Sequence, residues 1–481
     1  MEANIWKKIP GQLCRIKPVS KNRSHSFFHI HFVCCSAINI PLLLNKVKVL
    51  IPTREKNMFR FASFLVTTVT FVCVSTSHGD DWPQWRGPNR DCVSNEKNLL
   101  QSWSGSGPKL LWTFRDAGDG YSSPAVVGNQ LFMMGVQKDT ETIFSLDTKT
   151  GKPLWSTEIG KPYPNKWGGG PRSTPTFDSG KVYGISGEGD LICVDAKSGK
   201  REWLVSLAKE LEGKVMKIWG FSESPLVDGN KVVCSPGGPK GSIAALDKNT
   251  GKVIWRTTEI TDEASYSSII KAKVGKHEVY IQMTAGGLVG VDANTGKKLF
   301  AEKVAVNNIA IIPTPIFFDN KVYVTSDYGS GCGLVELTPS DSGIKSKVVY
   351  ENKVMQNHHG GVILHKGHIY GASGNCNERS ARWKCQDVAT GEMKWESEKL
   401  NQTGSITMAG GRIYLYGQND GTVVLIDPNT KDFTETGRFK IPETTKKERQ
   451  SGKIWTHPVV SNGKLFLRDL DLVFCFDVSS N

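Results

Sequence analysis

The sequence is poor in several features that would indicate a membrane, zinc or haem protein. The apolar stretch at residues 61–74 is too short to span a bilayer. None of the 11 cysteines forms a CxxC or CxxCH motif, which argues against a zinc ribbon and a covalently attached c-type haem. Hydrophobic residues nevertheless make up 38% of the 481 residues. That content allows a sizeable core and excludes a disordered chain.

Excess positive charge is also small outside the first part of the chain, although the formal net charge is +13. Residues 1–79 contain 11 Lys and Arg but only 2 Asp and Glu, and the rest contains 49 basic and 45 acidic residues. The excess therefore belongs to the leader. The remainder gives no reason to expect a nucleic acid or an anionic membrane as partner.

Residues 58–79 have the layout of a secretory signal peptide. Arg60 follows Met58, an apolar stretch comes next, and small polar residues lead to a cleavage point near Gly79. We therefore predict export to the periplasm or the extracellular space, with no membrane span after cleavage. Residues 1–57 are interpreted as an over-extended start or a disordered leader, and the alternative is a second apolar anchor at residues 32–44.

Seven cysteines remain after the leader. Cys193, Cys385 and Cys475 each lie two residues before an Asp of the repeat described below, so they occupy one face of equivalent strands. This position predicts free, buried thiols that pack as small apolar side chains. Cys376 and Cys385 could alternatively form a local disulfide in an exported protein.

Two short phrases alternate along the rest of the chain, eight times each. The first reads Asp-x-x-Thr/Ser-Gly-Lys-x-x-Trp, as in residues 147–155, and its successive acidic positions are 40 to 52 residues apart. The second consists of two apolar segments around an Asp, Gly or Asn turn, as in residues 173–183. Both phrases predict strand, tight turn, strand, and in the first phrase Asp accepts backbone N–H bonds while Gly adopts a positive φ.

Four strands in a unit of this length are typical of a propeller blade. The recurring Trp is expected to pack between neighbouring blades. The ends of the chain predict closure, because residues 108–112 supply a Trp strand without its Asp half and residues 473–477 supply the missing half. We predict an all-β, eight-bladed β-propeller of four-stranded blades over residues 105–478, monomeric and preceded by an N-terminal strap at residues 80–104.

One position in each blade, just before the innermost strand, is expected to face the central channel, where ligands of such folds bind. The eight residues at these positions are Tyr121, Arg172, Ser222, Tyr266, Ile312, His359, Thr403 and Trp455. Their neighbours include Glu223, Asn308, His358 and His457.

Each of these residues has a structural and a functional interpretation. The aromatic residues Tyr121, Tyr266 and Trp455 either pack the rim or stack on a ligand. Arg172 either grips a carboxylate or phosphate or pairs with Glu188 or Glu223.

His359 is a weak candidate for a catalytic residue. Alternation along a strand suggests that at most one of His358 and His359 reaches the channel. Glu223 and Asn308 could supply oxygen ligands for Ca²⁺, although their spacing matches no known metal motif.

The Asp-x-x-Thr/Ser-Gly-Lys-x-x-Trp phrase resembles the tryptophan-docking repeat of the pyrroloquinoline quinone (PQQ) propeller superfamily, which includes quinoprotein alcohol dehydrogenases and BamB-like assembly factors. Residues 81–88, Asp-Trp-Pro-Gln-Trp-Arg-Gly-Pro, resemble the start of secreted PQQ-like repeat proteins of planctomycete-type bacteria. The resemblance covers nearly the whole chain after the leader. It implies the fold and leaves the activity open.

The resemblance implies that a dehydrogenase would have adjacent cysteines against the quinone and a Ca²⁺ site. The only adjacent pair, Cys34 and Cys35, lies in the leader.

We therefore expect a non-catalytic binding or scaffold module of the cell envelope that binds a protein or small molecule at the channel face. The alternative is a PQQ- and Ca²⁺-dependent oxidoreductase of an alcohol or sugar. A third possibility is a hydrolase or lyase that uses His359 and Arg172. A lipid-anchored BamB-like form is disfavoured because Val72 precedes Cys73 where a small residue is needed.

Overall fold

The computed structural model describes residues 81–374, 381–449 and 451–480. The predicted signal peptide, the interpretation of residues 1–57 and the Cys376 half of the possible disulfide lie outside the described residues. Across the described ranges every regular element is a β-strand. They contain no helix that is long and apolar enough to cross a membrane.

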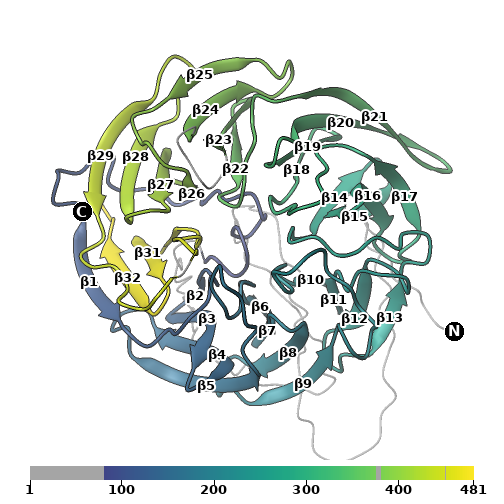
Figure 1. The fold of residues 1–481 in the computed structure, drawn as a ribbon, viewed down its shortest axis with the longest axis horizontal. Helices are drawn as coiled ribbons and strands as arrows, with labels where there is room; N and C mark the ends of the chain where they lie inside the picture. The colour runs from purple at the N-terminus through teal and green to yellow at the C-terminus, as the bar shows by residue number, and fades with distance from the viewer. Residues whose placement is uncertain (1–80, 375–380, 450, 481) are drawn as a thin grey trace, which may run out of the picture. The chain divides into compact units, whose positions relative to one another are not determined.

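The described chain is an eight-bladed β-propeller (Figure 1), as the repeat predicts. Blades 1 to 4 consist of β2 (Ala125–Val127), β3 (Gln130–Gln137), β4 (Thr140–Asp147), β5 (Pro153–Gly160), β6 (Thr176–Asp178), β7 (Lys181–Ile185), β8 (Asp190–Asp195), β9 (Arg201–Ser206), β10 (Leu226–Asp228), β11 (Lys231–Cys234), β12 (Ala244–Asp247), β13 (Val253–Arg256), β14 (Ile270–Val274), β15 (His277–Thr284), β16 (Gly287–Asp292) and β17 (Lys298–Glu302). Blades 5 to 8 consist of β18 (Ile316–Phe318), β19 (Lys321–Ser326), β20 (Gly331–Ser340), β21 (Gly343–Asn352), β22 (Val362–His365), β23 (His368–Ser373), β24 (Arg382–Asp387), β25 (Met393–Ser397), β26 (Gly404–Ala409), β27 (Arg412–Gly417), β28 (Thr422–Asp427), β29 (Thr434–Lys440), β30 (Val459–Ser461), β31 (Lys464–Asp469), β32 (Leu472–Asp477) and β1 (Lys109–Phe114).

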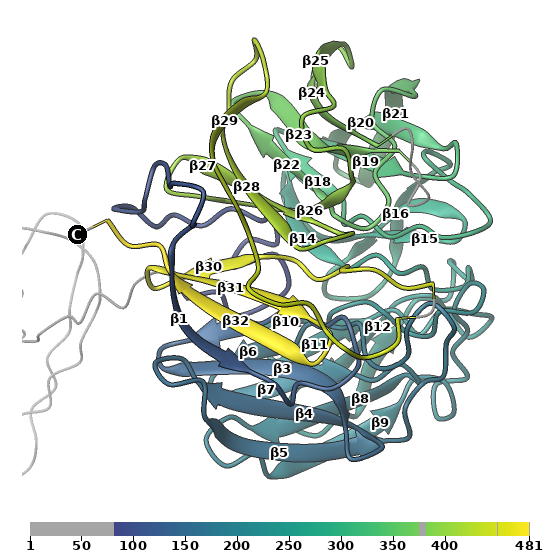
Figure 2. The same cartoon turned by 60° about the vertical axis from the view of Figure 1, so that its left-hand side comes forward.

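The ring closes through blade 8, which combines both ends of the propeller. Its sheet has the order β1-β32-β31-β30, and the antiparallel pairing runs from Lys109 opposite Asp477 to Phe114 opposite Val473. Figure 2 shows β1 alongside β32. This arrangement confirms the predicted closure by N- and C-terminal strands, because β1 supplies the fourth, outermost strand of blade 8 and pairs the outer edge of β32.

The turn chemistry of the repeat is confirmed at the Asp and Gly positions. The Asp147 Oδ1 atom accepts the backbone N–H of Thr150 at 2.8 Å, and Gly151 has a φ of 68°. The Trp of one blade then covers the turn of the next: the Trp155 Nε1 atom donates to the carbonyl of Ala196 at 2.9 Å, and a Cβ on Gly199 would lie 2.6 Å from the Trp155 ring. The glycine is therefore needed both for its φ and for the close approach of the ring.

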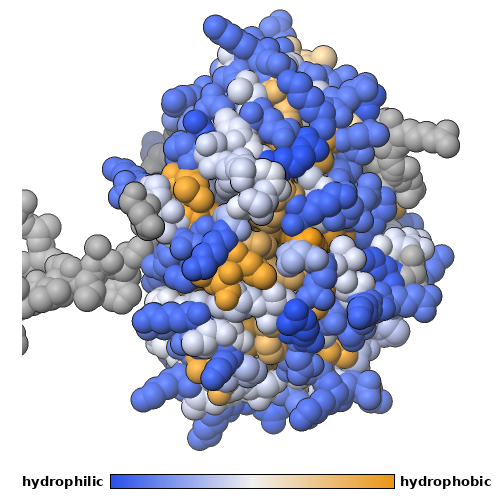
Figure 3. Space-filling model, turned by 90° about the vertical axis from the view of Figure 1, so that its left-hand side faces the viewer, coloured by the Kyte–Doolittle hydropathy of each residue, from blue (hydrophilic) through white to orange (hydrophobic). Residues whose placement is uncertain are grey.

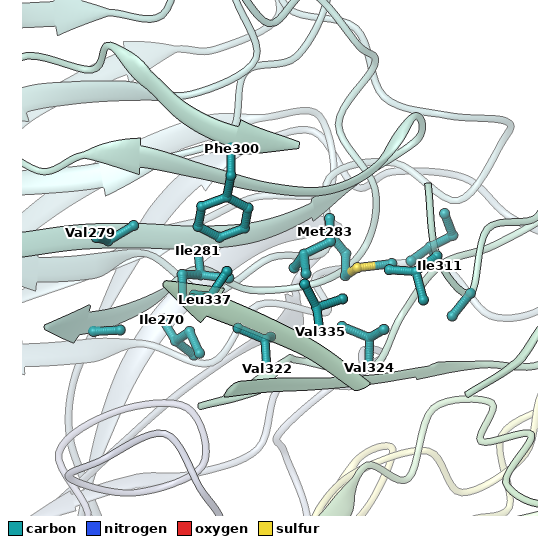
Figure 4. Packing of buried hydrophobic residues seen from close by; sticks show 14 of the residues in the cluster. Ile270, Val279, Ile281, Met283, Phe300, Ile311, Val322, Val324, Val335 and Leu337 are labelled. Atoms are coloured by element: carbon teal, nitrogen blue, oxygen red, sulfur yellow. The ribbon is translucent and has the colours of Figure 1, made fainter. Parts of the chain in front are cut away.

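The core consists of apolar layers between neighbouring blades. In Figure 4, Ile281 and Met283 of blade 4 face Val322 and Val335 of blade 5, and all four belong to one buried cluster. The predicted free thiols lie in such layers, since Cys193, Cys385 and Cys475 are all buried and unpaired. Because each blade buries both faces against its neighbours, the β-branched and aliphatic strands of the repeat form a continuous core.

The outer surface is predominantly hydrophilic, with apolar side chains between the charged ones (Figure 3). On the outermost strand of blade 8, Leu110 and Leu111 remain 39% and 38% exposed. Isolated apolar residues of this kind are ordinary on soluble proteins.

The N-terminal strap crosses the middle of the ring, where it is purple in Figure 1. Trp82 pairs with Val126 of blade 1, and the Pro83 carbonyl accepts the Phe177 N–H of blade 2. Farther along, Val93 forms a bridge to Met408 of blade 7. The strap therefore contacts blades 1, 2 and 7.

Two buried arginines attach the strap to the inner strands. Arg90 donates to the carbonyls of Ile269 at 2.5 Å and Ser224 at 2.8 Å. Arg86 donates to the carbonyl of Val362 at 2.6 Å. Arg90 thus satisfies carbonyls just before the inner strands of blades 3 and 4, and Arg86 satisfies one on the inner strand of blade 6.

Candidate functional site

A cavity of about 440 Å³ lies at the channel face formed by the segments that precede the inner strands. The Trp85 side chain of the strap lines it, and its Nε1 atom donates to the Thr314 hydroxyl at 2.9 Å. The other lining residues are Tyr121, Trp167, Arg172, Trp219, Ser222, Ser224, Tyr266, Ser268, Ile309, Ala310, Ile312, Tyr328, His358, His359, Ser451, Lys453, Trp455 and His457.

Seven of the eight channel-facing positions expected from the repeat meet at this cavity. They are Tyr121, Arg172, Ser222, Tyr266, Ile312, His359 and Trp455. The eighth, Thr403, is buried but does not line the cavity. The alignment of the hairpins thus identifies residues that are 44 to 334 positions apart in sequence and line one cavity.

Aromatic side chains form most of that wall. Tyr121 contacts Trp455 with ring centroids 5.2 Å apart, and Trp219 contacts Trp167 and Tyr266 at 5.6 and 5.7 Å. These rings present flat apolar faces beside a few polar groups, as in many small-molecule sites.

Arg172 provides a positive charge in the wall. Its Nη2 atom donates to the Gly168 carbonyl at 2.7 Å, its Nη1 atom donates to the Gly170 carbonyl at 3.3 Å, and its guanidinium lies 5.4 Å from the centroid of the Tyr121 ring. Burial lowers the pKa of Arg172, yet arginine keeps its proton at physiological pH.

No ion pair joins Arg172 to a carboxylate in the described part of the chain. The expected alternative, a pair with Glu188 or Glu223, is therefore not formed. Its two hydrogen-bond partners within the protein are neutral carbonyls. The carboxyl group of Glu141 interacts with the guanidinium electrostatically but forms no hydrogen bond or ion pair with it.

Three imidazoles lie on the opposite part of the wall. The Nδ1 atoms of His358 and His359 are 3.0 Å apart, the His358 Nε2 atom is 2.8 Å from the Tyr328 hydroxyl, and the His457 Nε2 atom is 3.0 Å from the His359 carbonyl. Burial lowers the pKa of His358 to about 4 and that of His457 to about 3, and it lowers the pKa of His359 well below the usual range. All three are neutral at pH 7.

The expectation that only one of His358 and His359 reaches the channel was wrong, because both line the cavity. The alternation argument applies within a strand, whereas β22 begins only at Val362. Residues 358 and 359 lie in the irregular segment before it, so successive side chains do not point to opposite faces.

The structure does not bring Glu223 and Asn308 together as Ca²⁺ ligands. Glu223 is buried behind the wall, where it accepts hydrogen bonds from the Ser235 N–H and from Gln282 Nε2. Burial raises the pKa of Glu223 to about 7, against the opposing charge of Arg90. Asn308 is exposed and does not line the cavity.

The cavity wall does not fit a calcium ion. None of the 19 lining residues in the described ranges is Asp or Glu. Within the described ranges, no group of three or more His, Cys, Asp or Glu side chains has the geometry for a metal. Because Ca²⁺ requires several oxygen ligands, usually including carboxylates, the lining supplies hydroxyls and imidazoles where a Ca²⁺ site needs acids.

Several lining residues lie outside the two repeated phrases, so the repeat did not predict them. Trp167, Trp219, Tyr328 and Lys453 come from loops whose length differs between blades. Trp85 comes from the strap, where the Trp-Pro-Gln-Trp sequence was the one available signal.

The fold and the site together define a class of protein: an eight-bladed propeller with tryptophan-docking turns and an aromatic cavity at one end of its channel. A family model described as outer membrane protein assembly factor BamB matches residues 139–397, more than half of the chain. The chain therefore belongs to this family of PQQ-like propellers.

Relatives of two kinds are similar to this chain. The dehydrogenase subunit of an alcohol dehydrogenase (quinone) from Gluconobacter oxydans is 30% identical over 203 residues, which cover 38% of this chain and 26% of that protein. Outer membrane protein assembly factor BamB from Kangiella koreensis is 26% identical over 211 residues, which cover 43% and 49%. The matches thus span between about a quarter and a half of these curated relatives.

Solved structures show the same fold. BamB from Moraxella catarrhalis superposes with a TM-score of 0.55 at 16% identity, covering 77% of this chain and all of that one. Quinohemoprotein alcohol dehydrogenase from Comamonas testosteroni gives a TM-score of 0.56 at 13% identity, covering 84% and 81%. Both kinds of relative share the propeller, so the fold alone does not distinguish an enzyme from a binding protein.

Proposed function

We propose that this chain is an exported, non-catalytic propeller that acts as a binding or scaffold module of the cell envelope and binds its ligand in the aromatic cavity. One observation carries the proposal: among the described residues, the cavity wall combines aromatic faces and the Arg172 guanidinium with no lining carboxylate. Such a wall can bind a ligand, but it offers little for proton transfer or metal chemistry.

The imidazoles support a binding role over a catalytic one. A general base works best when its pKa is near the operating pH. The pKa of His358 is lowered to about 4 and that of His457 to about 3, in both cases mainly by burial. His359 follows the same direction. At pH 7 these groups are weak bases, which makes the hydrolase or lyase alternative with His359 and Arg172 less favourable.

Two observations support a place in the envelope. Residues 58–79 have the layout of an export signal. Two of the relatives similar to this chain are named outer membrane protein assembly factors. In an envelope protein of this kind, the cavity face and its rim would carry the contact with a small molecule or a protein partner.

The alternative function is a PQQ- and Ca²⁺-dependent oxidoreductase of an alcohol or sugar. It is favoured by the similarity to quinone-dependent alcohol dehydrogenases, and the aromatic wall could stack against a planar quinone. It is disfavoured because no carboxylate among the described lining residues could hold Ca²⁺ or act as base.

The test uses the full chain expressed with its leader and purified from the envelope fraction. The protein is incubated with PQQ and Ca²⁺, and dye reduction is followed with a panel of alcohols and sugars. We expect no turnover. Dye reduction that depends on both PQQ and Ca²⁺ would overturn the non-catalytic proposal, and recovery of the protein only from the cytoplasm would overturn export.

A further inference from the structure

Large aromatic side chains join neighbouring blades around most of the ring. In blades 1, 2, 6 and 8 a tryptophan of the outermost strand lies on the turn of the next blade and donates its indole N–H to a carbonyl within two residues of the turn Asp. Tyr350 of blade 5 does the same with its hydroxyl group. The donors and acceptors are Trp155 and Ala196, Trp203 and Lys248, Trp395 and Asn429, Trp112 and Thr148, and Tyr350 and Val388, at 2.8 to 3.1 Å. Docking of one blade on the next therefore has two parts, a ring and a hydrogen-bond donor.

The ring and the donor can come from different residues, as in blade 3. The Trp255 ring of blade 3 lies on the turn of blade 4, where a Cβ on Gly296 would be 2.4 Å from it. The acceptor in this turn, the Ala293 carbonyl, is bound by Lys231 Nζ at 2.8 Å. The Trp255 indole N–H has no partner among the described residues. The acceptor is thus satisfied although the docking ring does not donate to it.

Blade 7 has a glycine at the position of the docking residue. Gly437 of β29 lies opposite Leu425 of β28, and the same register puts Trp203 opposite Cys193 in blade 2. The φ of Gly437 does not lie in the left-handed region, so the backbone does not require a glycine here. The missing side chain instead leaves space beside β29 for another residue.

Trp103 of the N-terminal strap occupies that space. A Cβ on Gly437 would lie 2.5 Å from the Trp103 ring, and the purple segment before β1 lies beside β29 in Figures 1 and 2. The centroid of the Trp103 ring is 5.7 Å from that of Tyr414 on the second strand of blade 7. In blades 2 and 6 the docking tryptophan lies 6.0 and 6.1 Å from the equivalent tyrosine. Trp103 therefore has the neighbours of a docking tryptophan.

The same segment of the strap supplies the donor. The repeat places the acceptor of blade 8 at the Val478 carbonyl, one residue after Asp477, and Leu100 donates its backbone N–H to this carbonyl at 2.8 Å. The indole N–H of Trp103 has no partner in the described part of the chain. This division matches blade 3, where the acceptor is also bound by a residue other than the docking tryptophan.

We propose that residues 98–103 complete the docking of blade 7 on blade 8, with the Trp103 ring in place of the missing tryptophan and the Leu100 N–H in place of its indole donor. Together with β1 they form a terminal clasp, residues 98–114, which must be released before blades 7 and 8 can separate. Both halves of the clasp belong to one continuous segment, so opening of blade 8 at β1 is coupled to opening of blade 7 at Trp103. The clasp goes beyond the proposed binding function and does not depend on what the cavity binds.

Simple coverage of an apolar surface accounts for less of the geometry. It would explain why the Trp103 ring lies 5.6 Å from that of Phe439. It gives no reason for a glycine at position 437 or for the bond between Leu100 and the Val478 carbonyl. The two interpretations differ in whether a tryptophan placed on β29 can replace Trp103.

The experiment is a double-mutant cycle on the purified full chain, measured by hydrogen exchange and mass spectrometry. Trp103→Ala should speed exchange in β1, β29 and β32 by about 10- to 100-fold, because it removes a large ring from a packed site. Gly437→Trp alone should speed exchange there by about 10-fold, because its side chain collides with Trp103. In the double variant the new tryptophan enters the space that Trp103 has left, and exchange should be slower than in either single variant.

Trp155→Ala is the matched control, since Trp155 is the docking tryptophan of blade 1. It should speed exchange in blades 1 and 2 by a similar factor and leave β29 unchanged. Trp103→Ala should leave β5 and β9 unchanged.

Two results from the cycle would overturn the clasp. One is exchange in the double variant that is as fast as in either single variant, and the other is a change of less than about 3-fold in Trp103→Ala. If Trp103→Ala does not fold, the double variant decides: recovery of folded protein supports the clasp, and failure to recover it overturns the clasp.

The wild-type protein gives an independent readout of the donor. The Leu100 N–H should exchange at least about 10-fold more slowly than that of the exposed Gly105, after correction for their unstructured rates. A smaller difference would overturn the role of Leu100.

Discussion

One fully buried arginine, Arg468, joins blade 8 to blade 1 at the seam where the ring closes. Its removal tests the contribution of this seam to the stability of the propeller. Arg468 of blade 8 is 0% exposed. Its guanidinium donates to the carbonyls of Leu470 at 2.7 Å, Ser122 at 2.9 Å and Met134 at 2.7 Å. Two further bonds reach Ala117 and Gly118. Four of the five acceptors therefore belong to blade 1 or to the segment before it.

The variant Arg468→Met keeps much of the volume but removes all five donors. Each buried carbonyl that loses its donor costs about 1–3 kcal/mol. The costs are not additive, because the carbonyls are close together and can share water or other donors. Breaking a buried charged network costs about 3–5 kcal/mol in measured cases, and we expect a loss of that size in the free energy of unfolding.

The measurement is urea unfolding followed by tryptophan fluorescence, combined with hydrogen exchange of the native protein. Exchange should increase in β1, β31 and β32 more than in the distant blade 4. Arg438→Met is the control, since Arg438 forms an exposed pair with Glu435 at 2.7 Å, worth about 0–1 kcal/mol. If Arg468→Met costs no more than this control, or if exchange rises evenly around the ring, the reasoning about the seam is wrong.

Three further predictions follow from other contacts. Gly199→Ala introduces a Cβ at a φ of 73° and 2.6 Å from the Trp155 ring, so it should lower the free energy of unfolding by about 2–4 kcal/mol. Gly229→Ala is the control: its φ is also positive, but no atom lies within 4 Å of the added Cβ, and the loss should be only about 1 kcal/mol. The pKa of His457 is lowered to about 3 in the folded state, so below about pH 6.5 the unfolded chain binds a proton that the folded chain does not, and the free energy of unfolding falls by up to about 1.4 kcal/mol per pH unit. Between pH 6.5 and 4, the free energy of unfolding of His457→Gln should therefore decline less steeply than that of the wild type. An equal decline would contradict the burial of His457. Arg90→Met leaves the Ile269 and Ser224 carbonyls without their donor and should lower the free energy of unfolding by about 2–4 kcal/mol. It should also make the strap the first site of limited proteolysis. If the strap resists the protease as well as it does in the wild type, other contacts hold it in place.

The fold could be predicted from the sequence because the information is local and repeated. Asp147 and Gly151 determine a turn through one side-chain acceptor and one positive φ, and the same solution recurs around the ring. The closure was predictable as well, because residues 108–112 and 473–477 supply complementary halves of one unit. Repetition makes each copy an independent test of the same pattern.

The site was predictable only where it follows the repeat. Arg172 and Trp455 precede inner strands and therefore have a definite place in each blade. Trp167 and Lys453 come from loops that differ between blades, and no periodic signal places them. Glu223 was expected at the cavity but does not line it. It directly follows the lining residue Ser222, and this shift of one residue directs its carboxyl group into the protein behind the wall.

The strap also constrains the order in which the molecule can be assembled. It is the first described segment of the chain, yet Arg86 bonds to Val362, which lies 276 residues later, and Val93 bridges to Met408. These contacts cannot form until the inner strands of blades 6 and 7 are in place. Because contacts of large sequence separation slow folding, seating of the strap and docking of β1 on β32 are expected to be late steps.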